Sequence, residues 1–74
     1  MQSSEAGRAR AITVNGEAVA TSAVTLEALI FERGLEGARI ATARNGDFVP
    51  ARARAVTYIE AGDRIEIVSP RHGG

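Results

Sequence analysis

The 74-residue sequence contains no cysteine and no lysine. Without cysteine the chain has no disulfide, no thiol nucleophile and no thiolate metal ligand. The nine arginines are balanced by nine acidic residues, so net charge gives no reason to expect nucleic acid or an anionic membrane as a partner. No apolar run is long enough to span a bilayer, and the first residues lack the apolar segment of a signal peptide. We therefore expect a soluble, cytoplasmic protein with neither nucleic acid nor membrane as partner.

Aromatic residues are scarce as well, since Phe31, Phe48 and Tyr58 are the only ones. The core must therefore be built from Val, Ile, Leu and Ala. A chain of this length forms one small domain and has little room for a deep, enclosed active site, which favours a carrier, adaptor or subunit over an enzyme. The sequence has no glycine-rich phosphate-binding motif and a single histidine, His72. We expect no catalytic residue, no bound cofactor and no metal ion.

Two Asn-Gly pairs mark hairpins, because both central residues of a type I′ turn need positive φ. Asn15-Gly16 follows an alternating strand around Ile12 and Val14 and precedes a returning strand at 17–20. Asn45-Gly46 follows an alternating segment at 39–44 and leads into a short strand at 47–49. The sequence therefore predicts two antiparallel hairpins.

One helix is predicted between the hairpins. Thr25 is a suitable N-cap, and Gly34 can supply the left-handed residue that ends the helix. Leu26, Leu29 and Ile30 recur at the spacing of one helical face, so this face is expected to pack on a sheet.

The last predicted strand, at 64–69, alternates polar and apolar residues, and an irregular crossing with a short helical turn at 51–56 separates it from the second hairpin. A strand that enters after such a crossing can lie in the middle of the sheet, parallel to the first strand. The pattern predicts a two-layer α+β domain of the β-grasp kind, with a four- to five-stranded mixed sheet packed on one main helix, and leaves other strand orders open. Residues 1–7 are expected to be a disordered lead-in, 8–69 the domain and 70–74 a flexible tail.

The predicted tail is Pro70-Arg71-His72-Gly73-Gly74. Proline cannot donate to a ladder, so pairing should end at Pro70, and five extended residues reach roughly 16 Å. The two glycines have no side chain to obstruct a narrow channel. The tail could therefore carry its carboxylate into the active site of another protein, and a frayed glycine end is the alternative.

Four stretches and their order resemble the thiamine-pathway sulfur carriers of the ThiS family. They are Val14-Asn15-Gly16-Glu17, Thr25-Leu26-Glu27-Ala28-Leu29, Asn45-Gly46-Asp47-Phe48-Val49-Pro50, and Gly62-Asp63-Arg64-Ile65-Glu66-Ile67-Val68 with the final Gly73-Gly74. The resemblance implies a ubiquitin-like β-grasp protein whose Gly74 is adenylated and then converted to a thiocarboxylate. It also implies three partners: a ThiF-like adenylating enzyme that consumes ATP, a ThiG-like thiazole synthase, and a sulfur donor such as a cysteine desulfurase. The chemistry then belongs to the partners, and the chain is not itself an enzyme.

A partner-binding surface is expected beside the tail. If Ile65 and Ile67 face the helix, Glu66 and Val68 face outward. With Ala41 and Ala43 on the neighbouring strand, Val68 would form a small apolar patch next to charge, of the kind that a transient partner covers.

The sequence leaves three alternatives open. The chain could be a sulfur carrier for molybdopterin synthesis, or for cysteine or tRNA thiolation. It could be a ubiquitin-like modifier that is joined to lysines of other proteins. It could also be a β-grasp binding module without chemistry at its terminus.

Overall fold

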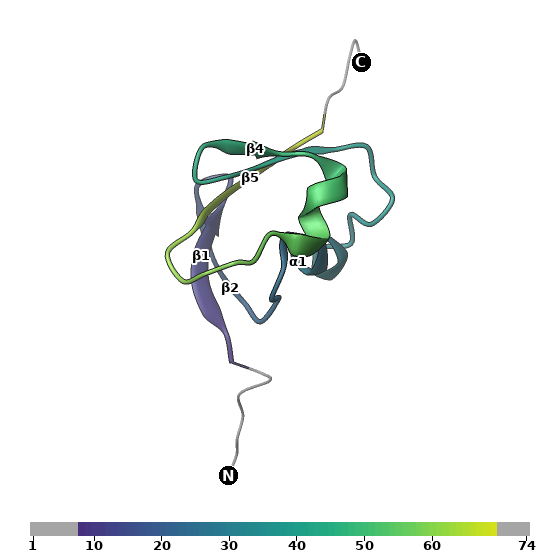
Figure 1. The fold of residues 1–74 in the computed structure, drawn as a ribbon. Helices are drawn as coiled ribbons and strands as arrows, with labels where there is room; N and C mark the ends of the chain where they lie inside the picture. Colours follow the sequence, from purple (N-terminus) through teal and green to yellow (C-terminus); the bar gives the residue numbers. More distant parts are fainter. Residues whose placement is uncertain (1–7, 70–74) are drawn as a thin grey trace.

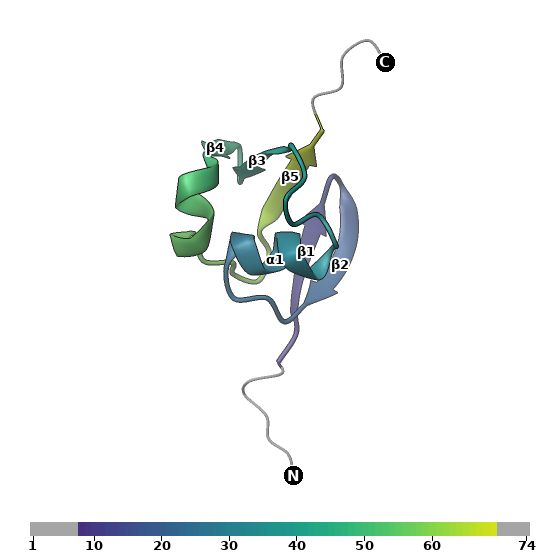
Figure 2. The ribbon, with the colours of Figure 1, turned by 90° about the vertical axis from the view of Figure 1, so that its right-hand side faces the viewer.

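The computed structural model describes residues 8–69, so the predicted lead-in and tail lie outside the described part. The elements in chain order are β1 (Arg10–Val14), β2 (Glu17–Thr21), α1 (Leu26–Glu32), β3 (Ala41–Arg44), β4 (Asp47–Val49), the 3₁₀ helix η1 (Ala51–Val56) and β5 (Arg64–Val68). The five strands form one sheet in the order β2-β1-β5-β3-β4, and α1 crosses one of its faces (Figure 1, Figure 2). The predicted two-layer α+β architecture is confirmed.

Both Asn-Gly pairs form the predicted turns. The φ angles are 52° and 85° at Asn15 and Gly16, and 52° and 87° at Asn45 and Gly46. These values match a type I′ turn, whose twist suits a two-residue hairpin. The second hairpin is shorter than predicted, because β3 begins at Ala41 and Ile40 stays outside the strand.

Helix α1 begins and ends at the predicted residues. The Thr25 hydroxyl accepts the Ala28 N–H at 3.1 Å. At the other end Gly34 has a φ of 75°, its N–H donates to the Phe31 carbonyl, and the Leu35 N–H donates to the Ile30 carbonyl. This pair of bonds is a Schellman motif, which satisfies carbonyls that the helix leaves free.

The crossing from β4 to β5 contains η1, which lies beside α1 in both views (Figure 1, Figure 2). Arg54 ties η1 to β3, because its guanidinium donates to the Thr42 hydroxyl at 3.0 Å and to the Ile40 carbonyl at 2.9 Å. Between η1 and β5, Tyr58 makes one isolated bridge, to Thr25.

Strand β5 lies in the middle of the sheet. It runs parallel to β1, with Val14 opposite Ile65, and antiparallel to β3, with Ala41 opposite Val68. The end of β5 therefore lies at the side of the molecule opposite the start of β1 (Figure 1). This central parallel strand completes the predicted β-grasp topology.

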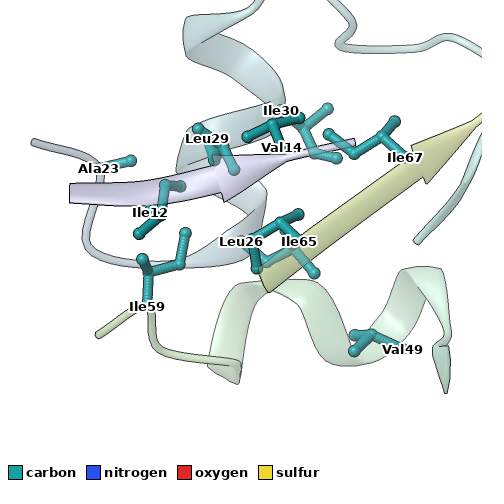
Figure 3. Close-up of a cluster of buried hydrophobic side chains, with 10 residues drawn as sticks. All are labelled: Ile12, Val14, Ala23, Leu26, Leu29, Ile30, Val49, Ile59, Ile65 and Ile67. Atoms are coloured by element: carbon teal, nitrogen blue, oxygen red, sulfur yellow. The ribbon is translucent and has the colours of Figure 1, made fainter. Parts of the chain in front are cut away.

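The core lies between the sheet and α1 and is wholly aliphatic. Side chains from β1, α1 and β5 point toward one another in Figure 3. The buried residues are Ile12, Val14, Ala23, Leu26, Leu29, Ile30, Val49, Ile59, Ile65 and Ile67. All three aromatic rings are exposed, so aromatic packing contributes nothing to this core.

Among the described residues, no helix has the length and apolar character needed to cross a membrane.

Candidate functional site

The residues predicted to contact partners come together on the face of the sheet that α1 does not cover. Ala41 lies opposite Val68, and Ala43 lies opposite Glu66. Val68 is 56% exposed, whereas its neighbour Ile67 is buried. Successive side chains of a strand point to opposite faces, so the burial of Ile65 and Ile67 turns Glu66 and Val68 outward.

Phe48 belongs to the same surface, and the sequence analysis missed it. Phe48 pairs with Ala43 across the second hairpin and is 69% exposed. A hollow of about 560 Å³ lies here, lined by Asn15, Ala41, Thr42, Ala43, Phe48, Glu66 and Val68. The sequence could have indicated Phe48 through strand alternation. If Val49 is the buried residue of this short strand, Phe48, which directly precedes it, must face outward. We call the surface formed by Ala41, Ala43, Phe48, Glu66 and Val68 the sheet face.

Asn15 joins the first hairpin to the end of β5. Its Nδ2 donates to the Ile67 carbonyl at 3.0 Å, and its Oδ1 accepts the Ile67 N–H at 2.9 Å. One side-chain amide thus satisfies a donor and an acceptor of a buried backbone. Asn15 was selected from the sequence for its turn geometry alone.

Asp63 holds the beginning of β5. Its carboxylate accepts from Arg44 Nε at 2.6 Å, from Asn45 Nδ2 at 3.0 Å and from the Glu60 N–H at 2.9 Å. Burial alone would raise the pKa of Asp63, but hydrogen bonds from Arg44, the Glu60 N–H and Asn45 outweigh it and leave this pKa below its ordinary value. The bond to Asp63 in turn raises the pKa of Arg44. The negative charge is thus fixed in place as a structural link between the second hairpin and β5.

A second hollow, of about 540 Å³, lies between α1 and η1. Its lining includes Phe31 and Ala28 of α1 together with Ala51 and Ala55. Two polar groups in it serve the fold, since the Thr25 hydroxyl caps α1 and Arg54 bonds to β3. Within residues 8–69, no group of three His, Cys, Asp or Glu side chains is placed to hold a metal ion.

The five predicted tail residues, Pro70, Arg71, His72, Gly73 and Gly74, lie outside the described residues. The structure places the strand that precedes them. β5 ends at Val68, on the sheet face and beside Ala41.

Comparison with known protein families assigns this chain to one of them. The model of the ThiS family matches residues 7–74, which include both glycines at positions 73 and 74. The chain belongs to the ThiS family.

A solved structure and a curated protein are similar to this ThiS-family chain. The crystal structure of thiamine biosynthesis protein ThiS from Geobacter metallireducens matches with a TM-score of 0.75, covering 86% of this chain and 99% of the other. At 22% sequence identity, this likeness shows the fold. A thiazole synthase from Paramagnetospirillum magneticum is 38% identical over 64 residues, which are 85% of this chain and 20% of that protein. The chain therefore spans about a fifth of the length of this curated relative.

Proposed function

We propose that this chain carries sulfur for thiazole formation as a thiocarboxylate on Gly74. The observation that carries the proposal is the ThiS family match, which runs through the diglycine at positions 73 and 74. The absence of cysteine agrees with it, because the sulfur must then be held by a group other than a side-chain thiol. In this proposal residues 70–74 enter the active sites of partner enzymes.

The proposed chemistry begins with activation of the carboxylate. A carboxylate is a poor electrophile, because its charge repels nucleophiles and its oxygen is a poor leaving group. Attack of a Gly74 carboxylate oxygen on the α-phosphorus of ATP releases pyrophosphate and gives an acyl-adenylate. A sulfur nucleophile then attacks the acyl carbon and AMP leaves, so that a carbon–sulfur bond replaces a carbon–oxygen bond.

The partners supply this chemistry. A ThiF-like enzyme would bind the ATP and form the adenylate, and a donor such as a cysteine desulfurase would provide the sulfur as a persulfide. Attack of the persulfide then gives an acyl disulfide, and a thiol reductant cleaves its sulfur–sulfur bond to release the thiocarboxylate while being oxidised to a disulfide. A ThiG-like thiazole synthase would consume the thiocarboxylate. The relative from Paramagnetospirillum magneticum supports this last partner, since a region similar to this chain is part of a protein named thiazole synthase. The chain is then a protein substrate, with no catalytic residue and no bound cofactor of its own.

The sheet face is the proposed docking surface for the activating enzyme. Four of its five residues are apolar, and Val68 is the last residue of the strand that leads toward Gly74. Its small extent suits a partner that must bind and leave again, because transient interfaces are smaller than permanent ones. Glu66 lies among the apolar side chains and can pair with a cation of the partner.

The proposal is tested by following the sulfur. The chain ending at Gly74 is incubated with the activating enzyme, ATP and a sulfur donor, treated with a thiol alkylating reagent, and its intact mass is recorded. Because the sequence has no cysteine, a single alkyl adduct that maps to Gly74 identifies a thiocarboxylate. Alkylation is needed because replacement of oxygen by sulfur has the same nominal mass change as oxidation of Met1.

A matched control is the same chain with one residue added after Gly74, which should give no adduct. An activating enzyme that modifies its own carrier but leaves this chain unmodified would contradict the proposal. Covalent attachment of the chain to larger proteins would favour the protein modifier instead. Growth that is restored by the thiazole precursor, in cells lacking the chain, would separate the thiamine pathway from other sulfur-transfer pathways.

A further inference from the structure

The side chain of Asn15 extends the parallel ladder between β1 and β5 by one step. In the backbone part of this ladder, the Thr13 N–H donates to the Asp63 carbonyl at 3.0 Å and the Asn15 N–H donates to the Ile65 carbonyl at 2.9 Å. The next position along β5 is Ile67. There the Asn15 amide both donates to the carbonyl and accepts from the N–H, at 3.0 Å and 2.9 Å, across 52 residues of sequence.

No backbone of β1 can make this last contact, because the chain turns away into β2. Asn15 has a φ of 52° and begins the turn, so β1 ends just before the position opposite Ile67. Ile67 is buried, and a buried backbone donor without a partner is costly. The amide of Asn15 therefore replaces a missing strand residue at this point.

Ile67 lies close to the place where the domain ends and the chain continues toward Gly74. Only Val68 of β5 follows it, and Val68 pairs with Ala41 of β3 on the other side. Ile67 is thus the last residue of β5 whose backbone is tied to the first hairpin. Asn15 also lines the hollow on the sheet face, so its amide lies where the proposed docking surface meets the end of the strand.

We propose that Asn15 is a positioning residue for activation: by holding Ile67 it fixes the point and direction in which the chain leaves the sheet face toward Gly74. When a partner docks on the sheet face, the chain that leads to Gly74 then starts from one fixed position. If the chain left the sheet one or two residues earlier, the carrier would still dock, but its carboxylate would reach the reacting position less often. This inference rests on the proposed function, because it assigns Asn15 a role in that activation.

The chain offers a matched control in the second Asn-Gly turn. Asn45 has the same φ of 52°, and its Oδ1 accepts the Arg64 N–H at 2.8 Å. It therefore also binds β5 through its side chain, but at the entry to the strand. Glycine adopts positive φ without strain, so Asn15→Gly and Asn45→Gly each keep the turn and remove only the amide.

Amide hydrogen exchange measured by NMR reports directly on the hydrogen bond between the Ile67 N–H and the Asn15 side chain. In Asn15→Gly, exchange of the Ile67 N–H should accelerate roughly tenfold or more, because its hydrogen-bond acceptor is removed. In Asn45→Gly, the Ile67 N–H should keep its wild-type rate and the Arg64 N–H should exchange faster. This measurement does not depend on sulfur chemistry.

Steady-state kinetics with the activating enzyme report the positioning role. Well below the melting temperature of every variant, Asn15→Gly should lower kcat about five- to tenfold and change KM less than about twofold, because docking is retained while productive placement is lost. Asn45→Gly should leave both constants at the wild-type values. Asn15→Asp keeps an acceptor for the Ile67 N–H but loses the donor to its carbonyl, so its kcat should lie between those of wild type and Asn15→Gly.

Several results would overturn the inference. Wild-type kcat in Asn15→Gly, with faster exchange at Ile67, would show that the amide is only structural. An equal loss of kcat in Asn45→Gly would assign the effect to β5 as a whole. Unchanged exchange at Ile67 would show that the Asn15 amide does not protect the Ile67 N–H. Failure of the unaltered chain to form a thiocarboxylate would overturn the proposed function and this inference with it, and the wild-type sample alone reveals that case.

Discussion

Replacement of Asp63 by asparagine should destabilise the fold by breaking the link between the second hairpin and β5. Asp63 is only 5% exposed and accepts hydrogen bonds from Arg44 Nε, Arg44 Nη2, Asn45 Nδ2 and the Glu60 N–H. Asn has nearly the same shape but carries one oxygen in place of two and no charge. At least one of these donors must therefore lose its partner in Asp63→Asn.

The size of the effect follows from the burial of the two partners. A hydrogen bond to a charged group contributes about 1.5–3 kcal/mol. The Arg44 side chain is 31% exposed, so in the variant water can hydrogen-bond to its guanidinium and reduce the destabilisation. We expect the free energy of unfolding to fall by roughly 2–3 kcal/mol at neutral pH, which lowers Tm by on the order of 10–20 °C for a domain of this size.

The pH dependence of stability should change as well. Because hydrogen bonds to the carboxylate outweigh burial, the pKa of Asp63 in the folded chain lies below the unfolded value of 3.8. A group with a depressed folded pKa stabilises the fold at pH values above its unfolded pKa, and this contribution is lost as pH falls through the folded pKa. Wild-type stability should therefore decrease on acidification below about pH 5, and Asp63→Asn should show a smaller decrease.

The test is urea denaturation followed by far-UV circular dichroism at neutral and acidic pH, since the chain has no tryptophan to report by fluorescence. Glu60→Gln is the matched control, because Glu60 is an exposed carboxylate in the same turn. It should leave both the stability and its pH dependence close to wild type. Equal stability of Asp63→Asn and wild type at neutral pH, or an equal loss on acidification, would refute the role assigned to this carboxylate.

Two further substitutions test the sheet face and the helix cap. Val68→Asp should lower kcat/KM for activation about tenfold, mainly through KM, because it places a charge in an apolar contact. The control is Val56→Asp, at a valine of η1 that is 70% exposed, which should leave kcat/KM unchanged. Equal effects of the two variants would discard the sheet face as the docking surface. Thr25→Ala should cost about 1 kcal/mol of stability, seen as a fall of Tm by roughly 5 °C, because the hydroxyl that accepts the Ala28 N–H is lost. Thr25→Ser keeps that hydroxyl and should stay close to wild type, and a similar loss in both would contradict the capping role.

The sheet face brings together residues that are far apart in the chain. Ala41 and Ala43 come from β3, Phe48 from β4, and Glu66 and Val68 from β5. The pairing of β3 with β4 and with β5 places them side by side. A substitution that shifts β5 by one residue against β3 would turn Glu66 and Val68 to the other face, away from Ala41 and Ala43.

The elements that depend on local chemistry were predictable from the sequence. Asn15 and Asn45 precede glycines and tolerate positive φ, so the sequence alone predicts both hairpins. Thr25 and Gly34 delimit the helix because capping depends on a few adjacent residues. The alternation in β5 likewise predicted that Val68 would be exposed. Each of these features is settled by neighbours within a few positions.

Contacts between distant segments were decided by the tertiary structure alone. Whether Asn15 reaches Ile67 depends on β5 lying parallel to β1, and whether Arg44 reaches Asp63 depends on β3 lying on the other side of β5. A turn asparagine has the same local pattern whether its amide faces water or a strand 52 residues away. Local neighbours in the chain thus specify the hairpins, the capped helix and the alternation of the last strand. Insertion of β5 between β1 and β3 decided which side chains meet, because hydrogen bonds and packing across the sheet depend on strand order, which local sequence does not encode.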